Sequence, residues 1–251
     1  MTFKIEVEKN VAELILDHPP VNAFSGAIWN RFPEVIYELG QRQDVRIIMI
    51  RAEGRGFCAG VDIKELADNS SAIVEVNKGN YETFKAIRGC EVPVLCAPHG
   101  YVIGGGIGMC GAADFIIASD DCFFSLPEID RGAMGGAAHL QRILPLPKVR
   151  AAFFTGGQIT AQEAYRLGGV EKIVPRADLY QEARAFAEIV AGKSRDALRI
   201  AKQALNGIEA FDVDKAYRWE QGFTLEMYMN EDSQKSRDAF VETGSAAKFE
   251  D

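Results

Sequence analysis

Two glycine-rich segments are the clearest candidates for chemistry in this sequence. The first covers residues 51–65 and the second covers residues 99–111, and each runs from an apolar stretch into a predicted helix. Glycine lets the backbone approach a ligand closely, and a helix N-terminus offers unpaired N–H groups. Two such N–H groups aimed at one carbonyl oxygen would stabilise an enolate or a tetrahedral oxyanion. The two segments together therefore predict an oxyanion hole.

An acidic stretch, Pro-Glu-Ile-Asp-Arg-Gly, supplies two carboxylates two residues apart, Glu128 and Asp130. On an extended backbone such residues face the same side. A carboxylate pair in a partly dry pocket separates into one acid and one base. We therefore expect Glu128 and Asp130 to share proton transfer. The same sequence also allows Asp130 to pair with Arg131 or to cap the next helix.

The second glycine segment also contains a dinucleotide-binding pattern, because Gly106, Gly108 and Gly111 satisfy G-x-G-x-x-G. That pattern normally opens the first strand–helix–strand unit of a fold. Here it lies in mid-chain behind several predicted strands, so it is weak evidence for a nucleotide. The three histidines share no ligand spacing, and the sequence predicts no metal site.

Composition narrows the function classes. The chain has 36 acidic and 28 basic residues, a formal charge of −8 that argues against a nucleic-acid partner. No apolar run approaches the roughly 20 residues of a membrane span. The five cysteines show no paired spacing, and the first residues carry no apolar signal-peptide core. We therefore expect reduced thiols and a cytoplasmic location.

The order of the predicted elements indicates an α/β fold. Apolar strands are expected at residues 45–50, 92–97 and 115–118, with helices between them. One helix is expected from an N-cap at Ser25 to Leu39. The apolar spacing over residues 178–241 predicts amphipathic helices, and no alternating or continuous apolar run there predicts a strand. We therefore expect an α/β core over residues 1–190 and a helical region over 191–251. That region would form a lid or an oligomerisation layer, or would complete a single core.

Six segments resemble the enoyl-CoA hydratase/isomerase (crotonase) superfamily in their order and spacing, over nearly the whole chain. They are residues 20–23, 60–64, 104–106, 125–129, 155–159 and 169–175. The resemblance implies a crotonase-like spiral of ββα units, with C-terminal helices that build a homotrimer or a homohexamer. It also implies an acyl-CoA substrate, with coenzyme A (CoA) as part of the thioester and no prosthetic group.

The same resemblance implies roles for particular residues. It places the oxyanion-hole N–H groups at Val61 and Gly105 and the main acid/base at Glu128. It places the phosphates of CoA near Lys64, and also near Lys248. The adenine and pantetheine would run along two short segments that include Val21, Ala23, Ala59, Asp62 and Ile63.

One position departs from the hydratase pattern. Hydratases of the superfamily use two glutamates to position and activate water, and the first of these corresponds to Gly108 here. Half of the acid/base pair is therefore missing, which argues against ordinary water addition to an enoyl-CoA. A single glutamate, Glu128, suffices for the Δ3–Δ2 enoyl-CoA isomerases of the superfamily.

Five further segments are similar to a narrower subgroup, the ring-opening CoA-ester hydrolases of bacterial steroid catabolism. They are residues 51–57, 127–132, 139–142, 201–206 and 217–224. That similarity implies a retro-Claisen reaction, in which activated water attacks a ring ketone of a cyclic β-diketone and a C–C bond breaks to give an enolate. The alternatives are a hydratase or an isomerase, or a non-catalytic member that binds CoA esters or RNA.

Overall fold

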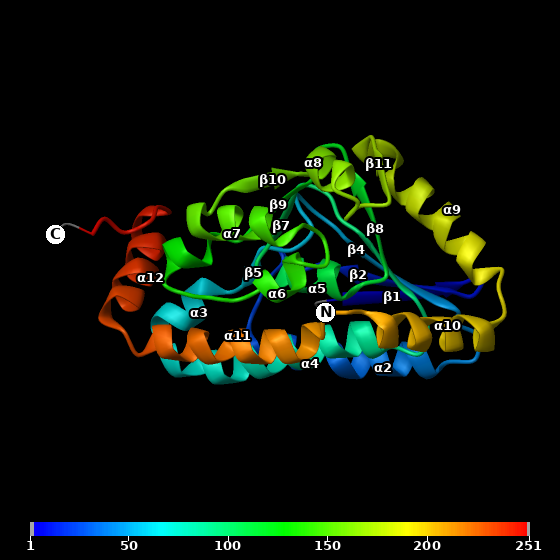
Figure 1. The fold of residues 1–251 in the computed structure, drawn as a ribbon, viewed down its shortest axis with the longest axis horizontal. Coiled ribbons are helices and arrows are strands. Elements are labelled where there is room, and N and C mark those ends of the chain that lie inside the picture. The colour runs from blue at the N-terminus through cyan, green and yellow to red at the C-terminus, as the bar shows by residue number, and fades with distance from the viewer. Residues whose placement is uncertain (1–2, 250–251) are drawn as a thin grey trace.

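The structure is a computed structural model that describes residues 3–249, and a six-stranded sheet lies at its centre (Figure 1). The outer hairpin strands are antiparallel, and all other neighbours in the sheet are parallel. Strands covered on both faces consist of continuous apolar residues. For this reason the apolar runs at residues 45–50 and 92–97 predict strands from the sequence alone. In spatial order the strands are β1 (Phe3–Glu8), β2 (Val11–Leu16), β4 (Ile47–Ala52), β6 (Val94–Ala97), β8 (Phe115–Ser119) and β11 (Lys172–Val174).

Two smaller sheets stand beside the large one and give the chain its repeating pattern. One contains β10 (Gln158–Thr160), β9 (Phe123–Ser125) and β7 (Tyr101–Ile103), and the other pairs β3 (Ala23–Phe24) with β5 (Gly60–Val61). A strand of the large sheet, a strand of a small sheet and a helix follow one another repeatedly, as in β6, β7 and α5. The predicted α/β spiral of ββα units is therefore confirmed.

Helices surround these sheets, and residues 3–249 also form three short 3-10 turns, η1 to η3. The helices are α1 (Gly26–Trp29), α2 (Phe32–Gln41), α3 (Ile63–Asp68), α4 (Ile73–Gly89), α5 (Gly105–Ala112), α6 (Ala137–Leu140), α7 (Leu146–Thr155), α8 (Ala161–Arg166), α9 (Leu179–Ala191), α10 (Arg195–Ile208), α11 (Val213–Tyr228) and α12 (Glu231–Thr243), and the turns are η1 (Ser70–Ala72), η2 (Pro127–Arg131) and η3 (Arg176–Asp178). No helix of the described residues is long and apolar enough to cross a membrane.

The prediction of one continuous helix from Ser25 to Leu39 is wrong. Ser25 does cap α1, since its hydroxyl accepts a hydrogen bond from the Ile28 N–H. However, that helix ends at Trp29, and a separate helix, α2, begins at Phe32. Pro33 lies in the first turn of α2 and has no N–H to continue the hydrogen-bond ladder. The Trp29 carbonyl, four residues earlier, accepts a hydrogen bond from the Thr83 hydroxyl instead (3.0 Å).

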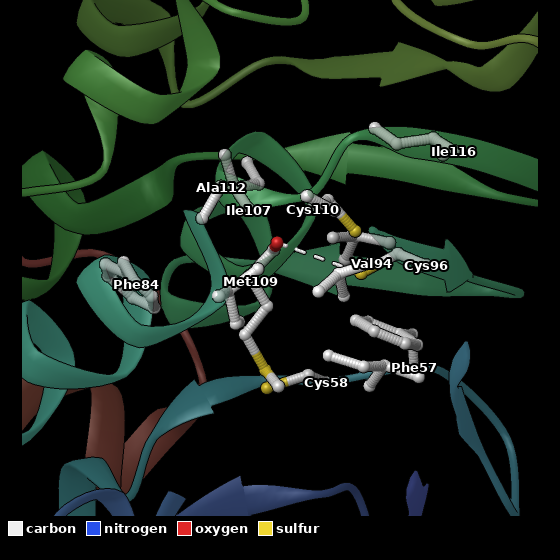
Figure 2. Close-up of a cluster of buried hydrophobic side chains, with 14 of the residues drawn as sticks. Phe57, Cys58, Phe84, Val94, Cys96, Ile107, Met109, Cys110, Ala112 and Ile116 are labelled. Carbon is white, nitrogen blue, oxygen red and sulfur yellow. Dashed lines mark hydrogen bonds between the residues drawn. The ribbon is translucent and has the colours of Figure 1, made fainter. Parts of the chain in front are cut away.

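The second glycine segment is embedded in the main core. Its helix α5 is apolar on every side, which requires burial all round. Figure 2 shows Ile107, Met109 and Cys110 of α5 among side chains from other elements, with the Cys96 thiol directed at the Met109 carbonyl (3.7 Å). All five cysteines are unpaired and buried. Burial raises the pKa of the Cys58 thiol to about 12, so it is a packing group rather than a nucleophile.

The C-terminal helices pack on the core at different places. α9 covers one face of the large sheet, α11 lies against α4 and α6, and α12 lies against α3 and η2 (Figure 1). Val213 and Tyr217 of α11 belong to the same buried cluster as the strands. The predicted boundary between the core and the helical region, after residue 190, therefore falls within α9. The role of residues 191–251 as a lid or an oligomerisation layer stays a prediction.

Lys202 attaches α10 to the core through a buried ammonium group. Its Nζ donates to the Ile87 carbonyl (2.9 Å) and the Val92 carbonyl (3.2 Å), and it pairs with Asp114 at 2.8 Å. The side chain is only 3% exposed. Two of its acceptors have a second donor, since the Val94 N–H donates to the Asp114 carboxylate (2.7 Å) and the Cys90 N–H donates to the Ile87 carbonyl (3.4 Å). Lys202 adds the buried positive charge.

We expect Lys202→Met to lower the free energy of unfolding by about 3 kcal/mol, because it leaves the partly buried Asp114 carboxylate without its cation and removes a hydrogen bond from each of two carbonyls. Chemical denaturation measures this. The control is Lys172→Met, which removes an exposed ion pair with Glu182 and should cost less than about 1 kcal/mol. Equal losses in the two variants would contradict the assignment.

Candidate active site

The two glycine segments lie backbone against backbone. Gly60 has a φ of +84°, a conformation that favours glycine. A Cβ atom there would stand 3.2 Å from the Gly105 nitrogen and 3.1 Å from the Ile103 carbonyl oxygen. A hydrogen bond from the Ile103 N–H to the Cys58 carbonyl (2.9 Å) holds the two segments together. Glycine at position 60 therefore permits the contact.

The two N–H groups expected to form an oxyanion hole are available in this arrangement. Asp62 N donates to the Phe24 carbonyl of β3 (3.1 Å), and successive N–H groups of a strand point to opposite sides. The Val61 N–H therefore points away from β3. Gly105 is the first residue of α5, where an N–H has no partner within the helix. Both residues line one pocket.

The space within that pocket, including the part open to solvent, is about 650 Å³. Its walls come from the two glycine segments, from α3 and α4, from η2 and the chain that follows it, and from α11. Most of these residues are apolar, and few of the polar ones carry a charge. Within residues 3–249, no group of three or more His, Cys, Asp or Glu side chains is arranged to hold a metal ion.

Glu128 is the carboxylate that faces this pocket. Its Oε1 atom lies beside the Gly104 backbone, 2.5 Å from where a Cβ of that glycine would stand. Its Oε2 atom is buried, and no hydrogen-bond partner for it exists among the described residues. Burial raises the pKa of Glu128 to about 8. A carboxyl group with such a pKa can both take and return a proton near neutral pH.

The extended backbone expected for Glu128 and Asp130 is wrong. Pro127 begins the 3-10 turn η2, whose three residues per turn place positions two apart on different sides. The Asp130 side chain is exposed and lies beside Gly156, and it does not line the pocket. It does not cap the next helix either, since the first N–H groups of α6 donate to Glu220.

Arg131, which the sequence analysis considered only as a partner for Asp130, lies at the pocket instead. Residues three apart in a 3-10 turn share a side, so Arg131 accompanies Glu128. Its guanidinium lies 4.3 Å from the centre of the Phe240 ring of α12. Proline at the start of η2, combined with the Glu-x-x-Arg spacing, is the signal that could have identified it.

Another side chain fills the space that the missing hydratase glutamate would need at position 108. Gly108 is buried in α5, and the Phe84 ring occupies the space into which a side chain at position 108 would extend. Edge-on contacts with Trp29 (5.9 Å between centroids) and His139 (4.8 Å) hold that ring. A carboxylate at position 108 would therefore require Phe84 to move.

Glu220 on α11 is a second buried carboxylate that the sequence analysis missed. It accepts hydrogen bonds from the Ala137 N–H (2.9 Å) and the Ala138 N–H (3.0 Å), and burial raises its pKa. These bonds secure the start of α6, directly after the Gly135 and Gly136 backbone that lines the pocket. Its position indicates a support for the pocket wall.

The predicted CoA-binding residues have mixed positions. Ala59 and Ile63 line the pocket, and Ala23 pairs with Gly60 in the β3–β5 ladder. The Asp62 carboxylate caps α3 by accepting from the Lys64 N–H (3.0 Å), so it is engaged with the backbone. Val21 is half-buried, and the Lys64 and Lys248 side chains are exposed outside the pocket lining. The roles of these residues stay predictions.

The fold and the paired glycine segments define a class of protein, and comparison with known proteins agrees. The model of the enoyl-CoA hydratase/isomerase family matches residues 6–251, and the chain belongs to this family. A solved enoyl-CoA hydratase/isomerase from Xanthobacter autotrophicus Py2 shares the fold at a TM-score of 0.89 and 20% identity, covering 97% of this chain and 94% of that one.

Two curated relatives are more similar in sequence. A (7aS)-7a-methyl-1,5-dioxo-2,3,5,6,7,7a-hexahydro-1H-indene-carboxyl-CoA hydrolase of Rhodococcus jostii is 44% identical over 93% of this chain and 92% of its own. The protein of the same name from Mycobacterium tuberculosis is 40% identical over 93% and 96%. A probable enoyl-CoA hydratase of Mycobacterium bovis is 31% identical. The predicted similarity to the ring-opening hydrolase subgroup is therefore confirmed.

We expect Gly108→Glu to lower the free energy of unfolding by at least about 2 kcal/mol, because the new side chain meets the Phe84 ring in a buried site. In the double variant Gly108→Glu/Phe84→Ala the loss should be smaller than the sum of the single losses by at least about 1 kcal/mol. Denaturant titration measures both values.

Gly207→Glu is the matched control for this prediction. Gly207 is an exposed helical glycine with open space around it, so a glutamate there should be neutral or slightly stabilising. Additive losses at positions 108 and 84 would show that Phe84 does not exclude a glutamate from position 108.

Proposed function

We propose that this chain is a CoA-ester hydrolase that opens a ring of a bicyclic diketone carried as a CoA thioester. One observation supports this most strongly: a single glutamate faces the paired glycine segments, and Phe84 occupies the place of the second one. Two relatives at 40% and 44% identity carry the name of such a hydrolase. The chain is thus an acyl-CoA enzyme of its family, with hydrolysis as the favoured reaction.

The proposed reaction uses Glu128 twice. Ionised Glu128 takes one proton from water while the water oxygen bonds to the carbon of a ring ketone, which becomes an alkoxide. The C–C bond beside that carbon then breaks, and its electron pair forms an enolate conjugated with the thioester carbonyl. Protonated Glu128 returns its proton to carbon, so one water is consumed and the glutamate is regenerated. The ketone carbon ends as a carboxylic acid.

The two backbone N–H groups stabilise the enolate in this proposal. Val61 and Gly105 would donate to the thioester oxygen, where negative charge collects after the C–C bond breaks. Preorganised donors of this kind each contribute about 3–4 kcal/mol of transition-state stabilisation. The remainder of CoA would lie along Val21, Ala23, Ala59, Asp62 and Ile63, with its phosphates near Lys64 and Lys248. Isothermal titration with CoA tests this arrangement, and no heat at millimolar ligand would contradict it.

We expect Glu128→Gln to lower kcat by about 10²–10⁴-fold, because the amide can neither take nor return a proton. In the unmodified enzyme kcat/KM should rise with pH and level off above about pH 8, since the raised pKa keeps the free glutamic acid protonated below that value. Steady-state kinetics from pH 6 to 9.5 measure this.

Asp130→Asn is the control, and it tests the shared proton transfer expected for Asp130. We expect it to keep turnover within a few-fold, because that side chain points away from the pocket. Abolished turnover with retained folding would restore Asp130 to the mechanism.

A Δ3–Δ2 enoyl-CoA isomerase is the second candidate, because one glutamate beside an oxyanion hole can shuttle one proton. Crotonyl-CoA, a 3-enoyl-CoA and a bicyclic diketone CoA thioester distinguish hydratase, isomerase and hydrolase activity. Conversion of the 3-enoyl-CoA alone would overturn the hydrolase proposal. Binding of CoA without turnover of any substrate would favour a non-catalytic member of the family.

We further propose that the chain forms a homotrimer or a homohexamer and resides in the cytoplasm. An apolar groove along α7 and α11 exposes Leu146, Phe154, Trp219 and Phe223, which are 41–74% exposed. Apolar surface of this kind marks protein interfaces. Five unpaired cysteines fit a reducing compartment.

We expect Trp219→Glu to shift the mass measured by light scattering from the oligomer to a smaller species, because a charge in an apolar interface is costly. Ile200→Glu, at an exposed position of α10 outside that groove, is the control and should leave the mass unchanged. An unchanged mass for Trp219→Glu would place the interface elsewhere.

A further inference from the structure

Arg131 differs from the other inward-facing arginines in having no acceptor. Five others pair with carboxylates or with several backbone and side-chain oxygens: Arg88, Arg142, Arg184, Arg195 and Arg237. Among residues 3–249, the Arg131 guanidinium makes no ion pair and no hydrogen bond, and it lines the pocket beside Glu128. Its nitrogens are not sealed off, unlike the unpartnered nitrogens of Arg88, Arg195 and Arg237.

The Phe240 ring determines how this guanidinium is presented. The cation lies 4.3 Å from the ring centre, a favourable cation–π contact that covers one side of it. The N–H groups of a guanidinium lie at its edge, so the stacking leaves them free to donate. Removing a guanidinium from water without pairing it with an anion costs free energy. The Arg131 guanidinium, with free N–H groups at the pocket, is therefore suited to bind a ligand oxygen.

The proposed reaction produces two negative oxygens, and the oxyanion hole can hold only one. The first arises on the ring ketone when water adds, and the second arises on the thioester when the C–C bond breaks. The ketone oxygen becomes part of a carboxylate, a planar pair of oxygens that a guanidinium binds through two N–H groups. An isomerase generates only the thioester enolate and has no use for a second anion site.

We propose that Arg131 binds the ring ketone oxygen under attack and then the carboxylate formed from it, an inference that rests on the proposed hydrolase function. The substrate class is an acyl-CoA whose acyl group carries a second carbonyl remote from the thioester. The product class is the CoA ester of a dicarboxylic acid. The water proton not taken by Glu128 leaves with the new carboxylic acid and is released to solvent when that acid ionises.

Binding of unreactive probes tests the anion site without any turnover. Glutaryl-CoA carries a terminal carboxylate, and pentanoyl-CoA of the same chain length does not. We expect the unmodified protein to bind glutaryl-CoA at least about tenfold more tightly, and Arg131→Gln to lose this preference while its affinity for pentanoyl-CoA stays unchanged. Arg131→Lys should keep part of the preference, and the exposed-site control Arg166→Gln should keep all of it. Retained pentanoyl-CoA binding shows that each variant is folded.

Turnover of the bicyclic diketone thioester separates this inference from the proposed function. Arg131→Gln should lower kcat and move the midpoint of the kcat/KM profile to higher pH, because the Arg131 charge lowers the Glu128 pKa. Equal preference for both probes in the unmodified protein, or a preference kept by Arg131→Gln, would overturn the inference. If the unmodified protein shows an Arg131-dependent preference but does not cleave the diketone, the hydrolase function fails and the anion site stands.

Discussion

The site depends on the close approach of two backbones at Gly60 and Gly105. A Cβ at position 60 would press on the Ile103 carbonyl oxygen (3.1 Å) and the Gly105 nitrogen (3.2 Å), at a φ of +84° that side chains rarely adopt, so glycine is favoured there. The surrounding core holds this contact in place, because α5 is buried on every side and the bridge between Cys58 and Val102 joins the two segments. Under the proposed function, this contact would position the two N–H donors of Val61 and Gly105 before any ligand arrives, and preorganisation of this kind is what makes such donors effective.

Electrostatics at the pocket follow from a single 3-10 turn. Its period of three places Glu128 and Arg131 on one side and removes Asp130 to the other. Burial raises the Glu128 pKa, while the Arg131 charge beside it acts in the opposite direction. The balance leaves a carboxyl group that changes protonation state near neutral pH, as the proposed reaction requires of a group that accepts and then returns the same proton.

Of the C-terminal helices, α11 lines the pocket and α12 packs against η2 beside it. α11 contributes Tyr217 and Thr224 to its wall and secures the start of α6 through Glu220, and α12 supplies the Phe240 ring that contacts the Arg131 guanidinium. This part of the pocket wall is therefore built from segments more than 80 residues apart in the chain. Their positions make this wall sensitive to any change in how these helices pack.

Periodicity and local motifs determined the α/β class and the two glycine segments, because apolar runs and helix-opening glycines act over short stretches of chain. The resemblance to the family pointed to Glu128, which the structure places at the pocket. The family followed from the order of its motifs. The tertiary structure decided which side chains from distant parts of the chain contact those motifs. Only it shows that Phe84 fills the place of a second glutamate, that Thr83 satisfies the carbonyl freed by Pro33, and that Phe240 supports Arg131. Each of these pairs joins residues far apart in sequence, and no local pattern encodes such a contact.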